Sequence, residues 1–163
     1  METKLNDIWV LWVHDNSNNW LLDSYSIIYE IRTIEDFWKI YNNFNLLGGL
    51  SKKNFYLMRK GITPIWEDEK HKNGGICSIK TSLSKTFSIW SELSMYIVGE
   101  TLFDDDDKML DITGISINYK NIWSIIKIWN SDNNNNIEEN FPQAIKNKYN
   151  KCSIRYNKNV IEY

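Results

Sequence analysis

Two tryptophans lie in polar, turn-rich segments of the chain rather than inside apolar runs. Trp20 directly follows the turn cluster at residues 15–19, DNSNN. Trp66 lies in the segment 61–75, GITPIWEDEKHKNGG, immediately before Glu67. Loops that a rigid sheet holds in place are where binding residues concentrate. Both indoles could instead fold back as plugs of the core, and spacing alone leaves these two interpretations open.

The carboxylate beside Trp66 favours a binding role. Two indoles can cover both π-faces of a flat cationic heterocycle by stacking and cation–π attraction. Glu67 can then accept charge-assisted hydrogen bonds from N–H donors on the edge of the ring. N7-methylguanine, the charged base of an mRNA cap, combines such a ring with such an edge. Trp20, Trp66 and Glu67 therefore predict a site for this base.

Composition argues against several other classes of protein. The chain has 163 residues, of which 42% are hydrophobic and 25% charged, as expected for a single globular domain over residues 1–163. A net charge of −2 argues against a protein that binds long nucleic acid through many phosphates. Two cysteines, no membrane-length apolar run and no signal-peptide core predict a cytoplasmic protein without membrane association. Abundant Asn, Ile and Lys indicate an AT-rich coding sequence, such as that of a protist or a large DNA virus.

No group of residues in the sequence has the pattern of a catalytic centre or a metal site. The acidic run Asp104–Asp107 lacks the spacing of a calcium-binding loop, so we expect a solvated turn there. His14 and His71, together with Cys77 and Cys152, do not have the spacing of a zinc site. No nucleophile–base arrangement and no phosphate-cradling glycine loop is visible. We therefore expect no enzymatic activity, no metal and no cofactor.

Strands and helices that could position the site residues follow from periodicity and turn signals. Runs of β-branched and aromatic residues predict strands over 8–13, 25–31, 55–58, 76–80, 112–119, 122–129 and 152–156. Helical spacing and capping signals predict three helices, over 33–43, 85–98 and 142–149. Strands joined by short turns and interrupted by three helices predict an α+β fold with the helices on one face of the sheet.

Several motifs in one order resemble the eukaryotic translation initiation factor 4E family. Segment 61–75 is similar to the cap-binding loop of that family. Residues 5–12, LNDIWVLW, match its first strand and residues 33–41, TIEDFWKIY, its first helix. Parts of 90–100 match the second helix, and 114–129 match a hairpin without a gap. The resemblance covers most of the chain. It implies a single curved antiparallel β-sheet with three α-helices on its convex face and the cap pocket on its concave side.

The resemblance also implies a role for each residue of the pocket. Trp20 and Trp66 would sandwich the methylated base, and Glu67 would bind its N1 and N2 edge. Trp129 would contact the N7 methyl group. Lys120 falls where the family has an arginine that faces the phosphate chain.

The phosphate end of the site departs from the family pattern. Two basic positions of the family align with Ile76 and Ile125, which cannot bind phosphate. Lys127 lies two residues after Ile125, and side chains repeat their direction every second residue along a strand, so Lys127 could replace the missing lysine. The alternative is that Lys127 is a solvated strand residue. We expect cap binding in the micromolar range or tighter, with a reduced dependence on salt.

The expected first helix carries a second candidate surface. Ile34 and Trp38 lie at positions i and i+4 and share one stripe, and an exposed Ile–Trp pair suggests a partner helix. In the family this surface binds a helical peptide from a 4G-type scaffold or a 4E-binding repressor. Glu92 and Gly99 match the family pattern there, whereas Ser91 replaces a leucine.

Three functions follow from these observations and stay open at this point. The first is a monomeric initiation factor that binds capped mRNA and recruits it for translation. The second is a competitor that holds caps without the usual scaffold, because Ser91 and Lys4 stand where the family has leucine and proline. The third is a protein-interaction module that has lost the nucleotide. Since the chain ends soon after its last expected strand, we also expect little contact beyond the first nucleotide.

Overall fold

The sheet at the centre of the molecule contains seven strands. A computed structural model describes residues 1–15, 18–50 and 53–159. Within these residues all strand pairs are antiparallel, in the spatial order β2-β1-β3-β5-β6-β4-β7. The strands are β1 Lys4–His14, β2 Ser26–Thr33, β3 Asn54–Arg59, β4 Gly75–Ser82, β5 Ile112–Tyr119, β6 Trp123–Asn130 and β7 Ser153–Lys158.

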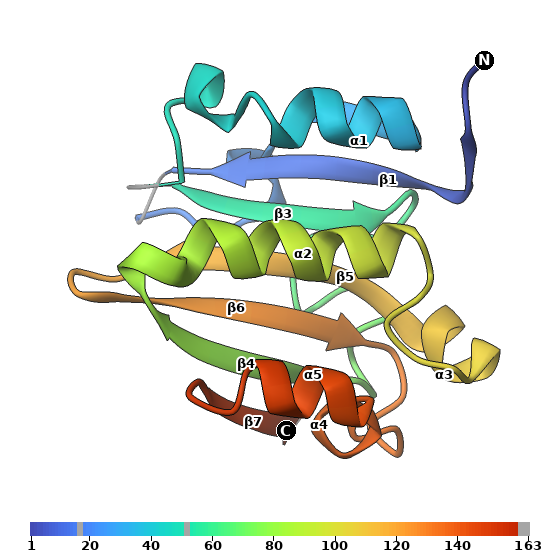
Figure 1. Cartoon of the computed structure of the whole chain (residues 1–163). Helices are drawn as coiled ribbons and strands as arrows, with labels where there is room; N and C mark the ends of the chain where they lie inside the picture. Colours follow the sequence, from blue (N-terminus) through green and yellow to red (C-terminus); the bar gives the residue numbers. More distant parts are fainter. Residues whose placement is uncertain (16–17, 51–52, 160–163) are drawn as a thin grey trace.

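Helices cover one face of this sheet. Figure 1 shows α1, α2 and α5 side by side over the strands, so the predicted α+β class with helices on one face is confirmed. Over the described part of the chain, no helix has the length and apolar character needed to cross a membrane. The α-helices are α1 Ile34–Tyr41, α2 Thr86–Val98, α3 Asp106–Asp111, α4 Ile137–Asn140 and α5 Gln143–Lys148. Short 3-10 turns are η1 Leu22–Ser24, η2 Phe44–Leu47 and η3 Leu83–Lys85.

The expected number of helices was too low. Residues around Asp104–Asp107 were expected to form a solvated turn, but Asp105 accepts hydrogen bonds from the backbone N–H groups of Asp107 and Lys108 and caps α3. Asn136 likewise caps the single turn of α4. Asp and Asn are favoured at helix N-caps, and acidic residues in the first turn interact well with the helix dipole. The Asp-rich start of α3 and the Asn-rich start of α4 therefore have the composition of loops although each begins a helix.

The capping pattern predicted at the start of α1 is present. The Thr33 side chain accepts from the backbone N–H of Asp36 at 3.0 Å, and the Asp36 carboxylate accepts from the backbone N–H of Thr33 at 3.2 Å. This capping box fixes the direction in which the helix leaves β2. Phe37 is consequently buried against the core, while Ile34 and Trp38 face outward.

Alternation along the strands divides the side chains between two environments. Trp9 and Leu11 of β1 lie in the large core under the helices, whereas Trp12 packs in a second, smaller cluster. That smaller cluster is centred on Tyr56 and Trp129. Since side chains of successive strand residues point to opposite faces, the second cluster marks the face of the sheet that the helices leave uncovered. We call it the pocket face.

The buried side chain of Arg59 joins segments that are far apart in the sequence. The Arg59 guanidinium is 4.5 Å from the centre of the Trp9 ring, and its Nη1 donates to Asp7 at 3.1 Å and to Glu100 at 2.8 Å. The same guanidinium donates to the main-chain carbonyls of Met109 and Ile112. This one side chain therefore connects β1 and β3 with the end of α2 and the start of β5.

Candidate functional site

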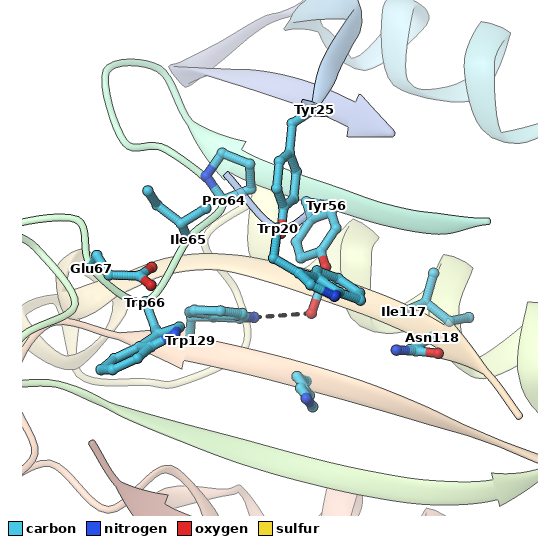
Figure 2. A pocket seen from close by; sticks show the side chains of 12 residues that line it. Trp20, Tyr25, Tyr56, Pro64, Ile65, Trp66, Glu67, Ile117, Asn118 and Trp129 are labelled. Carbon is cyan, nitrogen blue, oxygen red and sulfur yellow. Dashed lines mark hydrogen bonds between the residues drawn. The ribbon is translucent and has the colours of Figure 1, made fainter. Parts of the chain in front are cut away.

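One cavity of about 220 Å³ on the pocket face collects most of the predicted cap-binding residues. It is smaller than the roughly 300–1,000 Å³ typical of drug-sized ligands, so it suits a single ring system. Figure 2 shows Trp20, Trp66, Glu67 and Trp129 around it. The lining residues are Trp20, Tyr25, Tyr56, Pro64, Ile65, Trp66, Glu67, Ser116, Ile117, Asn118, Lys127 and Trp129.

The two loop tryptophans border the cavity from different connections of the chain. Trp20 comes from the segment between β1 and β2, and Trp66 from the loop between β3 and β4. Their exposed fractions are 51% and 53%, so neither indole closes the core. Large half-exposed aromatic surfaces beside a cavity are costly to leave in water, and they mark a surface for a ligand or a partner.

Trp20 is held by a network around the preceding residue. The His14 Nε2 and the Ser24 hydroxyl both donate to the carbonyl of Asn19, at 2.6 Å and 2.9 Å. The His14 ring is stacked on the Trp20 indole, with 4.3 Å between centroids and 29° between planes. It also contacts Tyr25 at 4.4 Å. The buried imidazole thus supports Trp20 from the side of the protein.

The loop that carries Trp66 is fixed by internal hydrogen bonds. Asp68 accepts from the backbone N–H and the hydroxyl of Thr63 at 2.8 Å and 2.6 Å, and from the backbone N–H of Lys70. Burial alone would raise the pKa of the Asp68 carboxyl, but these hydrogen bonds hold it below its ordinary value. Gly61 at the start of the loop has φ +91°, a conformation that glycine adopts at no steric cost.

A buried histidine connects this loop to the sheet. His71 Nδ1 lies 2.7 Å from the carbonyl of Ile65, which can only accept, so Nδ1 carries the proton. Its Nε2 then accepts from the hydroxyl of Thr113 on β5 at 2.9 Å. Burial lowers the pKa of His71, although the bond to Ile65 and the charge of Asp68 oppose that shift. The neutral ring holds the backbone one residue before Trp66.

Trp129 lies at the base of the cavity. Only 6% of it is exposed, and its Nε1 donates to the hydroxyl of Ser116 at 3.0 Å, the dashed bond in Figure 2. The ring of His71 lies 4.9 Å away. This hydrogen bond and the packing against Tyr56 and Met58 fix the indole against the sheet.

The two predicted phosphate-binding lysines have different positions. Lys127 is half-buried and lines the cavity, on the same face of β6 as Trp129. Lys120 is exposed in the turn after β5 and is not among the lining residues. Burial, and to a smaller extent the charge of Lys120, hold the pKa of Lys127 below its ordinary value. An anion near Lys127 would relieve both effects.

Several residues that line the cavity were not among the predicted site residues. Tyr25 and Tyr56 pack edge to face with 5.3 Å between centroids, and Ser116 holds Trp129. Burial raises the pKa of the Tyr25 phenol, and the negative charge of Glu67 adds to that effect. Along β3 and β5, Tyr56 and Ser116 alternate with residues that point into the core. Strand periodicity alone could therefore have indicated that both side chains lie on the pocket face.

The predicted partner surface is partly assembled on the helix side. Trp38, Ser91 and Glu92 line a shallow groove between α1 and α2, which Lys148 of α5 also lines. Ile34 is exposed on the same helix as Trp38, outside this lining, and Gly99 is exposed at the end of α2. The groove residues are Trp38, Phe87, Ser88, Ser91, Glu92, Met95, Tyr96 and Lys148.

Charge in this groove is already paired within the chain. The Lys148 ammonium lies 2.5 Å from the Glu92 carboxylate, and this contact raises the pKa of Lys148. The Ser91 hydroxyl is buried without a hydrogen-bond partner among the described residues. Those residues also contain no cluster of His, Cys, Asp and Glu that could hold a metal ion.

Comparison with known proteins decides the family. The sequence profile of the eukaryotic initiation factor 4E family matches residues 4–163, nearly the whole chain. The chain belongs to the eukaryotic initiation factor 4E family. Eukaryotic translation initiation factor 4E-1A of Danio rerio is 33% identical over 138 residues, which cover 80% of this chain and 62% of that protein. The chain spans about half to three fifths of the length of such curated relatives.

Solved structures of initiation factor 4E proteins share the whole fold. Ascaris suum eIF4E-3, solved with an m7G cap, superposes with a TM-score of 0.83 and 29% identity, over 98% of this chain and 93% of that one. Caenorhabditis elegans eIF4E-3, solved with the 4E-binding protein Mextli and a cap analog, gives a TM-score of 0.83 and 27% identity, over 97% and 93% of the two chains. The predicted curved antiparallel sheet is the fold of this family.

Proposed function

We propose that this chain binds the N7-methylguanine cap of mRNA. The observation that carries the proposal is the single cavity that Trp20, Trp66 and Glu67 line together, although they come from two different loops. Its relatives support the same ligand, since eIF4E-3 of Ascaris suum was solved with an m7G cap.

The proposed chemistry assigns one role to each group. Trp20 and Trp66 cover the two faces of the cationic base, and Glu67 accepts hydrogen bonds from its N1 and N2 donors. Trp129 contacts the methyl group, and Lys127 and Lys120 meet the phosphates. Each aromatic face contributes about 0.5–2 kcal/mol and each hydrogen bond to the carboxylate about 1.5–3 kcal/mol. Together these terms are of the size that micromolar binding needs, about 8 kcal/mol.

Retention on a cap-analogue resin, with elution by methylated or unmethylated guanine nucleotide, tests the proposal. The unchanged chain should be retained and should elute only with the methylated nucleotide. Trp20→Ala and Glu67→Ala should abolish retention, because each removes a whole face or the whole edge of the site.

Matched controls come from the same two segments. Leu21→Ala and Glu69→Ala change exposed neighbours that do not line the cavity, so both variants should be retained like the unchanged chain. A chain that is never retained, and whose tryptophan fluorescence the methylated nucleotide does not quench, would refute cap binding. That result would favour an interaction module that has lost the nucleotide.

We further propose that the groove beside Trp38 binds a helical peptide and so recruits capped mRNA for translation. The exposed Ile34–Trp38 stripe supports this role, and so does the C. elegans relative, which was solved with the 4E-binding protein Mextli. Trp38→Ala should reduce binding of a 4G-type or 4E-binding peptide at least tenfold, measured by calorimetry. Leu110→Ala, at an exposed position on α3, is the control and should leave peptide affinity unchanged.

A second function, a cap-binding competitor of translation, is favoured by two observations. Glu92 is paired with Lys148, so a basic group of a partner must displace an internal ion pair, and Ser91 offers less apolar surface than a leucine. A pull-down with scaffold peptide separates the two functions. A chain that binds the cap but retains no peptide would act as a competitor, and a stable ternary complex would exclude this alternative.

A further inference from the structure

A row of polar side chains continues from the cavity across the strands β5, β6, β4 and β7. In the strand register Ser116 lies opposite Lys127, Lys127 opposite Ser78, and Ser78 opposite Arg155. Residues directly opposite one another in antiparallel strands point to the same face of the sheet. These four residues, which we call the cross-strand row, therefore start in the cavity and end at the edge strand of the sheet.

The side of the sheet on which Arg155 lies follows from its neighbours. Ile154 and Tyr156 pack against the core under the helices, so alternation along β7 turns Arg155 toward the pocket face. Neighbouring strands are about 4.8 Å apart, which puts Lys127 and Arg155 roughly 10 Å apart across β4. Only the small side chain of Ser78 lies between them, so both cations can reach one extended anion.

The charge on this part of the pocket face is one-sided. The chain as a whole has a net charge of −2. On these four strands, however, the residues that point to the pocket face include the cations Lys80, Lys127 and Arg155 and no carboxylate. None of the three cations forms an ion pair with any residue in the described ranges. The Lys80 ammonium instead lies 4.2 Å from the centre of the Trp123 ring. These positions are Gly114, Ser116, Asn118, Trp123, Ile125, Lys127, Trp129, Ile76, Ser78, Lys80, Ser82, Ser153, Arg155 and Asn157.

We propose that the cross-strand row binds the polyphosphate of the capped nucleotide, with Arg155 as its outermost contact. The inference rests on the proposed cap binding, because the row begins at the cavity that would hold the base. A guanidinium can bind phosphate oxygens with two parallel hydrogen bonds, and the Ser78 hydroxyl can donate a third between the two cations. The row supplies positive charge on β6 and β7, from Lys127 and Arg155, that Ile76 and Ile125 cannot supply.

Arg155→Gln tests the assignment, because it removes the charge and keeps most of the side-chain length. Affinities for 7-methylguanosine triphosphate and for the nucleoside 7-methylguanosine are measured by tryptophan quenching at low salt. The variant should bind the triphosphate about tenfold more weakly, as expected for one lost charge-assisted contact of about 1.4 kcal/mol. Its affinity for the nucleoside should equal that of the unchanged chain.

Lys158→Gln is the matched control, since Lys158 lies on the same strand and alternates to the opposite face. It removes the same charge and should leave both affinities unchanged. Equal triphosphate binding by Arg155→Gln and the unchanged chain would overturn the inference, and so would an equal loss in Lys158→Gln. If the unchanged chain binds neither ligand, cap binding itself fails, which is a distinct result.

Ser78→Asp provides a second test, which does not depend on whether Arg155→Gln folds. Ser78→Asp places a carboxylate in the middle of the row, where it competes with phosphate for Lys127 and Arg155. Triphosphate affinity should fall about tenfold or more, with nucleoside affinity unchanged. Unaltered triphosphate binding by Ser78→Asp would overturn the assignment.

Discussion

At the scale of single residues, the cavity depends on two histidines that are not among the residues that line it. His14 lies under the Trp20 indole and donates to the carbonyl of Asn19, and His71 holds the carbonyl of Ile65 next to Trp66. Both rings therefore position tryptophans without facing a ligand. For His71 this role depends on the neutral ring, which donates through Nδ1 and accepts through Nε2.

The buried His71 predicts a pH dependence of stability. Its pKa is lower in the folded protein than in the unfolded chain, so the unfolded chain binds more protons in the window below about pH 6.5. The contribution of His71 is therefore complete above that pH and is lost as the pH falls through the folded-state pKa. The free energy of unfolding in urea, measured at intervals from pH 7 to 5, should decrease.

His71→Asn is the comparison for this measurement, because an amide offers a donor and an acceptor but does not titrate in that range. Its unfolding free energy should depend less on pH between 7 and 5 than that of the unchanged chain. The assignment is wrong if the two proteins show the same slope with pH.

At the scale of elements, the orientation of α1 decides which aromatic side chains the helix exposes. The capping box of Thr33 and Asp36 starts the helix directly at the end of β2. With that start, Phe37 and Tyr41 enter the core while Ile34 and Trp38 remain at the surface. The proposed peptide groove thus depends on a local feature one turn away from Trp38.

Thr33→Ala tests this cap. The hydroxyl accepts from the backbone N–H of Asp36 at 3.0 Å, and losing an N-cap costs about 0.5–2 kcal/mol. Thermal unfolding should show a lower midpoint for Thr33→Ala. Thr33→Ser keeps the hydroxyl and should be close to the unchanged chain, and equal midpoints for Ala and Ser would show that the cap contributes nothing.

At the scale of the whole molecule, Arg59 connects segments that are distant in the sequence. Its side chain is 9% exposed and bridges Asp7 near the start of the chain and Glu100 after α2. Glu100 has a positive φ of 54°, which is unusual for a residue other than glycine. Asn6 also donates to Glu100, at 2.7 Å. The cluster thereby ties the end of α2 to the sheet.

Arg59→Leu should be strongly destabilising. Removing the guanidinium leaves the largely buried Glu100 carboxylate without its cationic partner and takes one donor from each of two main-chain carbonyls, a loss of about 3–5 kcal/mol. Arg32→Leu is the control, because its ion pair with Glu30 is exposed to solvent and should contribute little to stability. Urea unfolding of both variants measures the difference, and similar losses would contradict the role of the cluster.

The sequence by itself determined what depends on neighbouring residues. Periodicity predicted the strands and the helices α1, α2 and α5, and the Thr33–Asp36 pattern predicted the cap of α1. The motif order identified the family, and the two-residue repeat in β6 placed Lys127 on the same face as Trp129. Each of these follows from backbone geometry over a few residues, which the order of residue types specifies directly.

Only the tertiary structure decided which distant residues meet. The spatial order of the strands puts β7 beside β4, and that order alone aligns Arg155 with Ser78 and Lys127. It also brings Lys148 to Glu92, and Tyr25 and Tyr56 to the cavity. Sequence spacing carries no information about such contacts, because they depend on how the elements pack and pair across the sheet rather than on the conformation of any one segment.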